Sequence, residues 1–216
     1  MLYVVGVGPG DPELMTLKAV RLIQNAGALV YVDTGMGKSA VSAILGDLTA
    51  GKPLFPLSIP MRGTRDAWRQ AHEEAAARLL DLLKQYETVV YPVLGDPGVY
   101  ASSSYLVSLI KDRHPVTIVP GITAMCQAAA QLGIPLCEQR EPVTILDSFQ
   151  PGQTLPKGNV VVMKSGKTLA AIREAASGRK AYAVRNLGME HEFCGLLADI
   201  PEDAYSYFTT VIVKAD

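Results

Sequence analysis

Three glycine-containing loops have the residue types and spacing best suited to ligand chemistry in this sequence. They read GVGPGDP at residues 6–12, LGDPG at 94–98 and PGIT at 120–123. Each follows a predicted β-strand, and ligands of open α/β sheets bind at the carboxyl ends of strands. A single loop of this kind is more often a simple turn. Three loops at the same position after a strand favour one shared ligand cleft.

The first loop partly matches a dinucleotide-binding motif. Gly6 and Gly8 have the spacing of the first two glycines of G-x-G-x-x-G, and Asp33 ends the next predicted strand, where a ribose-binding acid would lie. The third glycine is missing, because Asp11 occupies its position. We expect Asp11 to cap the helix that starts with Pro12, and its carboxylate would repel a pyrophosphate. The loop therefore favours a cationic cofactor without phosphate groups.

A second alternative is a P-loop-like nucleotide-binding protein. The segment GMGKSAVSAIL at residues 35–45 has Gly37, Lys38 and Ser39 opening a predicted helix after a strand. A complete Walker A motif also needs glycine at position 32, where this chain has Val32. The phosphate cradle is incomplete, and binding of magnesium ATP would be needed to support this alternative.

Strands and helices alternate around these loops. Apolar β-branched runs predict strands, and apolar residues at helical spacing predict helices. The expected strands are at 2–7, 28–33, 88–94, 116–119, 142–147, 159–164, 181–186 and 207–214. The expected helices are at 13–26, 64–86, 102–111, 124–132 and 168–177, three of them ended by Gly27, Gly133 and Gly178. This order predicts an α/β fold with a parallel-sheet half, residues 1–113, and a mixed-sheet half, residues 114–216.

Composition narrows the class of protein further. With 49 % hydrophobic and 19 % charged residues the chain should fold as a globular enzyme, and a net charge of −1 disfavours nucleic acid as a partner. No apolar run reaches the roughly 18 residues of a membrane span, so we expect a cytoplasmic protein. We interpret the three cysteines as reduced packing thiols, and the spacing of the histidines predicts no metal site. These residues are Cys126, Cys137, Cys194, His72, His114 and His191.

The glycine loops also carry a family resemblance. The pattern G-x-G-P-G-D-P, the later GDP-x-x-Y and the final PG-I-T together resemble the tetrapyrrole methylases over nearly the whole chain. Segments 60–76, 95–106, 160–169 and 207–214 look most like the branch that methylates C-20 of precorrin-2 or cobalt-factor II in cobalamin biosynthesis. Precorrin-4 C-11 and uroporphyrinogen III methylation remain alternatives, as does a non-enzymatic sensor that binds the same cofactor.

The resemblance implies S-adenosylmethionine as cofactor, a tetrapyrrole substrate, a homodimer, and two α/β domains with the active site in the cleft between them. Most contacts with the cofactor would come from backbone groups, which small residues allow to approach closely. The residues that the resemblance places at the cofactor are Pro9, Leu94, Gly95, Asp96, Val99, Ser102, Thr123, Ala124, Met163 and Leu187.

Catalysis needs a base for the meso proton and cations for the substrate carboxylates. Asp33 is the candidate base, with a turn or helix cap as the competing interpretation. The candidate cations are Arg62, Arg65, Lys38, Arg140 and Lys164.

Two glycine-loop residues give testable hypotheses from the sequence alone. Gly121→Val should weaken cofactor binding while leaving the protein folded. Asp96 should either attract the cationic cofactor through its charge or only shape its loop.

Overall fold

The computed structural model describes residues 1–33, 40–60, 63–201 and 205–215, and it divides the chain into two compact units. The first unit is Met1–Ile122 and the second is Thr123–Asp216. None of the described helices is long and apolar enough to cross a membrane.

The first unit is built on a parallel sheet with the strand order β3-β2-β4-β1-β5. Its strands are β1 (Leu2–Gly6), β2 (Ala28–Asp33), β3 (Leu54–Ser58), β4 (Val89–Val93) and β5 (Val116–Val119). Its helices are α1 (Leu17–Gln24), α2 (Ala40–Leu45), α3 (Arg65–Gln85) and α4 (Ser103–Ile110), with short 3-10 turns at Pro12–Leu14 and Gly46–Thr49.

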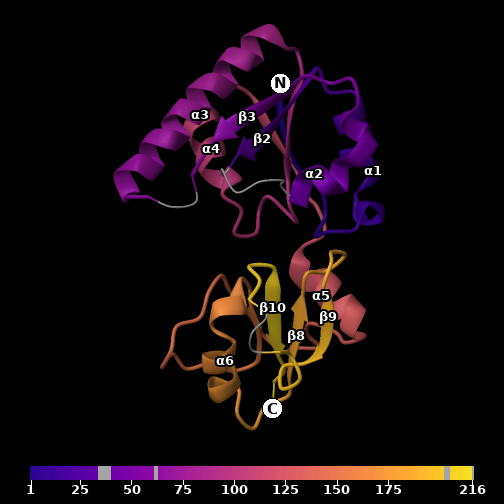
Figure 1. Ribbon diagram of the computed structural model, residues 1–216, viewed down its shortest axis with the longest axis vertical. Coiled ribbons are helices and arrows are strands. Elements are labelled where there is room, and N and C mark those ends of the chain that lie inside the picture. The colour runs from indigo at the N-terminus through magenta and orange to yellow at the C-terminus, as the bar shows by residue number, and fades with distance from the viewer. Residues whose placement is uncertain (34–39, 61–62, 202–204, 216) are drawn as a thin grey trace. The chain divides into compact units, whose positions relative to one another are not determined.

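Helices cover both faces of this sheet because its central strands are apolar on both sides. Leu2 and Val4 of β1 pack in one cluster with α3 and α4, while Val5 packs in another with α1 and α2. Figure 1 shows α3 and α4 on one side of the strands and α1 and α2 on the other. The long helix α3 begins where the sequence predicts, because Thr64 Oγ1 accepts a hydrogen bond from Ala67 N at 3.2 Å.

The second unit contains a mixed sheet with the order β6-β7-β10-β8-β9. Its strands are β6 (Val143–Leu146), β7 (Asn159–Val162), β8 (Ala181–Arg185), β9 (Phe193–Leu196) and β10 (Thr209–Val213). In this second sheet β6 pairs with β7 in parallel, and the other three described pairs are antiparallel. Helices α5 (Ala124–Leu132) and α6 (Leu169–Ala175) pack in different clusters, and Figure 1 shows them on opposite sides of the strands.

The predicted fold class is confirmed, and two details of the predicted elements are wrong. Strands β3 and β9 were not expected. The helix expected at 13–26 is only α1, because Thr16 Oγ1 accepts from Ala19 N at 3.1 Å and caps it, whereas Asp11 caps the separate turn Pro12–Leu14. The two compact units divide after Ile122, somewhat later than the boundary expected after residue 113, because β5 pairs with β1 in the first sheet.

The three cysteines also differ from their interpretation as packing thiols. Cys126, Cys137 and Cys194 are free, and all three are exposed. Each lies at a loop, an outward helix position or an edge strand, where the side chain has no core to enter.

Candidate functional site

The three glycine loops meet at one end of the first sheet. Strands β4, β1 and β5 are neighbours in register, with Gly6 opposite Val93 and Val5 opposite Val119. Because all three strands run in the same direction, the loops that follow them leave the same edge of the sheet. Gly95 N donates a hydrogen bond of 2.8 Å to Gly8 O, which joins the first and second loops directly.

The glycines of these loops are in backbone contact. A Cβ atom added to Gly6 would lie 2.6 Å from both Gly121 N and Gly95 O. Real Cβ atoms essentially never approach backbone atoms so closely. The absence of a side chain at Gly6 therefore allows the second and third loops to close over the end of β1.

The same contacts correct the expectation for Gly121→Val. A Cβ at Gly121 would lie 2.8 Å from the carbonyl carbon of Gly6 and would collide with the carbonyl oxygen of Gly95. The side chain would therefore press on the loop backbones of its own unit. We therefore expect this substitution to destabilise the first unit, whereas the sequence led us to expect weaker cofactor binding in a protein that stays folded.

Asp96 links two of the loops through its carboxylate. Its Oδ1 accepts from Gly98 N at 2.6 Å, which forms the turn after β4, and its Oδ2 accepts from Gly121 N at 2.9 Å. Both carboxylate oxygens thus hold backbone donors. These bonds connect the second loop to the third and favour the second of the two hypotheses drawn from the sequence, in which Asp96 shapes its loop.

The chemistry of the loops fits a cationic ligand without phosphate. They contain the carboxylates of Asp11 and Asp96, and segments 6–12, 94–98 and 120–123 contain no lysine or arginine. Gly95 is buried with φ +69°, a conformation that favours glycine, and beyond its two neighbours a Cβ placed there would meet Ile122 O at 3.9 Å. These features suit S-adenosylmethionine, whose sulfonium and ammonium groups are positive, better than they suit a nucleotide phosphate.

The other residues of the first unit that we expect to contact the cofactor lie in or next to the first two glycine loops. Pro9 is buried, Leu94 and Val99 are half-buried, and Ser102 is exposed just before α4. Val99 N donates to Asp96 O at 3.2 Å, which ties it to the same turn.

The other expected contacts gather separately in the second unit. Thr123 caps α5 by accepting from Cys126 N at 3.3 Å, and Ala124 begins that helix. Met163 and Leu187 follow β7 and β8 and pack in the cluster that faces α5. Strands β7 and β8 are both antiparallel to β10, so their carboxyl ends lie at one edge of the sheet.

Asp33 is the last residue of β2, and its side chain is exposed. Its backbone oxygen accepts from Ile59 N at 3.0 Å, which continues the pairing of β2 with β3. The residue therefore lies at the same edge of the first sheet as the glycine loops, two strands from β1 in the order of the sheet. This position is compatible with the role of a base that we expect for Asp33.

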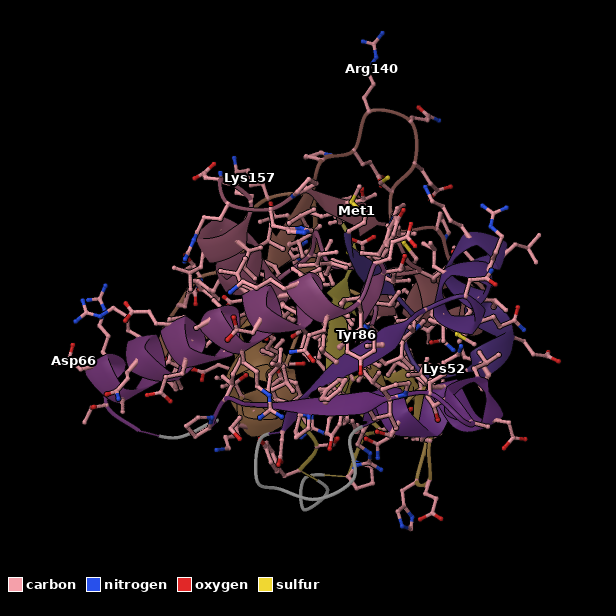
Figure 2. All side chains as sticks on the ribbon, turned by 90° about the horizontal axis from the view of Figure 1, so that it is seen from above. Met1, Lys52, Asp66, Tyr86, Arg140 and Lys157 are labelled. Carbon is pink, nitrogen blue, oxygen red and sulfur yellow. The ribbon has the colours of Figure 1, made fainter. Side chains whose placement is uncertain are left out.

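Three of the five expected substrate-binding cations lie among the described residues, each on a different segment. Lys38 and Arg62 lie outside the described residues, as does the P-loop-like segment Gly37-Lys38-Ser39. Arg65 is exposed at the first position of α3, and Arg140 extends outward from the turn at 138–141 (Figure 2). Lys164, half-buried after β7, adjoins the expected cofactor contact Met163.

No group of three or more His, Cys, Asp or Glu that could hold a metal ion occurs in the part of the chain that the structure describes.

Comparison with known proteins identifies the fold and the family to which these loops correspond. Residues 1–198 match the model of the family described as Tetrapyrrole (Corrin/Porphyrin) Methylases. The precorrin-2 C(20)-methyltransferase of Sinorhizobium sp is 31 % identical, with 97 % of this chain and 93 % of that protein covered. A probable cobalt-precorrin-2 C(20)-methyltransferase of Methanocaldococcus jannaschii is 30 % identical, with 99 % and 95 % covered. The crystal structure of a putative cobalamin synthesis related protein from Corynebacterium diphtheriae has the same fold, with a TM-score of 0.80 at 24 % identity over 99 % of this chain and 98 % of that chain.

Proposed function

Since the chain belongs to the tetrapyrrole (corrin/porphyrin) methylase family, we propose that this S-adenosylmethionine-dependent methyltransferase acts on C-20 of precorrin-2 or cobalt-factor II in cobalamin biosynthesis. The observation that carries the proposal is the identity of about 30 % with two relatives named for this reaction, over nearly the full length of all three chains. A match of this extent includes both units and not only the glycine loops.

The cofactor supplies a methyl group activated by a positive sulfur. The protein's part is to align the accepting carbon with that methyl group and to exclude water, and such alignment contributes at most about 7 to 11 kcal/mol. We assign Asp33 as the base that takes the meso proton, because it lies at the sheet edge where the glycine loops emerge.

We assign cofactor binding to the two groups of residues described above. In the first unit Asp96 holds the loops in position, and Pro9, Leu94, Gly95, Val99 and Ser102 provide backbone contacts. In the second unit Thr123, Ala124, Met163 and Leu187 contribute. The family resemblance further leads us to propose a homodimer that works in the cytoplasm, and light scattering on the purified protein measures the dimer.

A methyl-transfer assay tests the proposed reaction. Incubation with precorrin-2 and S-adenosylmethionine carrying a ¹³C-labelled methyl group is expected to add one methyl to the tetrapyrrole, with the label at C-20 in the NMR spectrum. Uroporphyrinogen III and precorrin-4 serve as competing substrates in parallel reactions. Faster methylation of either competitor would assign the protein to another reaction of the family, and cofactor binding without transfer to any tetrapyrrole would indicate a sensor.

Cofactor selectivity is tested by thermal stability. S-adenosylhomocysteine at about 100 times its Kd is expected to stabilise the native protein by about 2.7 kcal/mol. For a chain of this length that stabilisation corresponds to a rise in Tm of roughly 5 to 10 °C. NAD and magnesium ATP at the same concentration should leave Tm unchanged, because the loops present carboxylates to their phosphates. A larger shift with NAD would argue against the methylase, and a shift with magnesium ATP would support the P-loop alternative.

A further inference from the structure

One edge of the second unit combines exposed aromatic rings with lysines. We name it the aromatic–basic edge, and it consists of Lys164, Lys167, Tyr205, Tyr207 and Phe208. The aromatic residues are 55 %, 42 % and 39 % exposed in that order, which is unusual for three rings within one short segment. Exposed apolar groups gathered in this way are typical of a binding surface.

The rings and the lysines lie directly beside one another. The Lys164 ammonium is 5.9 Å from the centroid of the Tyr207 ring, and the Lys167 ammonium is 5.2 Å from that of Tyr205. Tyr207 and Phe208 meet edge to face, with centroids 5.5 Å apart. Flat apolar groups and positive charges are thus presented on one surface.

The backbone beneath this edge is held by several hydrogen bonds. Asn186 N donates to Phe208 O at 2.9 Å, and Ser206 Oγ donates to Asn186 Oδ1 at 2.6 Å. The buried Ser165 Oγ donates to Thr209 O at 3.0 Å. These bonds connect the segments after β7 and β8 to the segment before β10, so the edge is formed before any ligand arrives.

Gly166, which lies between the two lysines in the 3-10 turn Ser165–Lys167, shows how closely the segments pack. A Cβ at Gly166 would lie 2.9 Å from the carbonyl carbon of Ser206 and would collide with its oxygen. Lys167 is therefore carried on a backbone that is fixed against the segment bearing the aromatic rings.

The edge adjoins the expected cofactor contacts of the same unit. Lys164 follows Met163 directly, and Asn186, which holds Phe208, precedes Leu187. The register places Thr209 of β10 opposite Arg185 of β8 and Val211 opposite Val162 of β7, so all three segments lie at one end of the sheet.

We propose that the aromatic–basic edge binds the tetrapyrrole substrate, an inference that rests on the proposed function. The rings contact the apolar face of the macrocycle, and Lys164 and Lys167 pair with its acetate and propionate carboxylates. A flat ligand with several carboxylates matches this combination of groups, whereas an apolar ligand would leave the lysines without a role and a small anion would leave the rings without one.

A third lysine–tyrosine pair, Lys180 with Tyr182, serves as a control for a purely structural role of such pairs. Lys180 lies 5.5 Å from the centroid of the Tyr182 ring and is exposed, but it precedes β8 and so lies at the opposite end of the sheet. Lys180→Gln removes the same charge from the same kind of pair without touching the aromatic–basic edge.

The test compares steady-state kinetics of three variants with those of the full-length protein. The double variant Lys164→Asn/Lys167→Gln removes both charges, and asparagine tolerates the left-handed conformation of Lys164, whose φ is +53°. We expect it to raise KM for precorrin-2 about tenfold, the loss that corresponds to one charge-assisted hydrogen bond. Tyr207→Ala should raise KM about fivefold, as expected for one lost ring contact. In both variants the Kd of S-adenosylhomocysteine should stay within about twofold of wild type, and Lys180→Gln should match wild type throughout.

The outcomes separate this inference from the proposed function. An unchanged KM in the double variant, an equal rise in Lys180→Gln, or a parallel loss of cofactor affinity would overturn the assignment of the edge while leaving the methyltransferase standing. If wild type does not methylate precorrin-2, the proposed substrate fails, and titration with uroporphyrin III, followed by its fluorescence, then decides the inference by itself. Weaker porphyrin binding by the double variant alone would support the edge, and equal binding by all variants would refute it.

Discussion

Gly121→Ala is expected to lower the free energy of unfolding by about 3 kcal/mol or more, because a single added methyl group would overlap two backbones. The atoms nearest to its Cβ belong to Gly6, the last residue of β1, and to Gly95, two residues after β4 in the first sheet. A flexible side chain could rotate away, but these peptide groups could shift only by disturbing the pairing of β1 with β4. The midpoint of urea denaturation, followed by circular dichroism, measures the effect.

Gly133→Ala is the matched control for this substitution. Gly133 ends α5 with φ +65°, and no atom lies within 4 Å of its Cβ position. Alanine there bears only the cost of the left-handed conformation, about 1 to 2 kcal/mol. Gly121 is not among the glycines with positive φ, so its expected loss comes from contact alone. If Gly121→Ala lowered the free energy of unfolding by no more than Gly133→Ala does, the loops would not be packed as described.

The sequence predicted the central strands well because these strands are apolar on both faces. β1, β4 and β10 lie inside their sheets and consist mostly of buried valines and other apolar residues, which periodicity detects. The two missed strands, β3 and β9, are at sheet edges, and their burial alternates or is incomplete. Pro56 in β3 and Gly195 in β9 are also typical of loops in a sequence read without its partners.

The position of the glycine loops after three strands could be predicted from the sequence, but the hydrogen bonds between the loops could not. Glycine, proline and aspartate after three strands were enough to indicate a ligand site with a cationic, phosphate-free preference. The partner of Asp96 lies 25 residues away, after a different strand. Only the order β4-β1-β5 brings Asp96 and Gly121 together, and that order depends on packing across the whole sheet. The aromatic–basic edge was missed for the same reason, apart from Lys164, since its two segments, 164–167 and 205–208, are far apart in the sequence.

Asp96→Asn is expected to weaken the binding of S-adenosylmethionine and of S-adenosylhomocysteine by a similar factor, with each Kd rising about tenfold. The amide offers one acceptor oxygen where the carboxylate offers two, so either Gly98 N or Gly121 N would face an NH₂ group. Leaving such a donor without its partner costs about 1 to 3 kcal/mol. This loss loosens the loops before any ligand binds, and it therefore affects both ligands alike. Calorimetric titration of each ligand against wild type and variant measures the two factors.

Asp11→Asn serves as the control, because Asp11 lies in the first loop and, among the residues that the structure describes, its carboxylate accepts a local bond from Glu13 N at 2.8 Å. It removes one negative charge from the same set of loops without breaking a bond between them. If charge attracts the sulfonium, both substitutions should weaken the binding of S-adenosylmethionine more than that of S-adenosylhomocysteine, whose sulfur is neutral. If Asp96 acts by positioning the loops, Asp96→Asn should weaken the binding of both ligands equally, and Asp11→Asn should leave the binding of both unchanged. If Asp96→Asn weakened the binding of S-adenosylmethionine alone, this result would support the charge-based role and contradict the loop-positioning role that the hydrogen bonds favour.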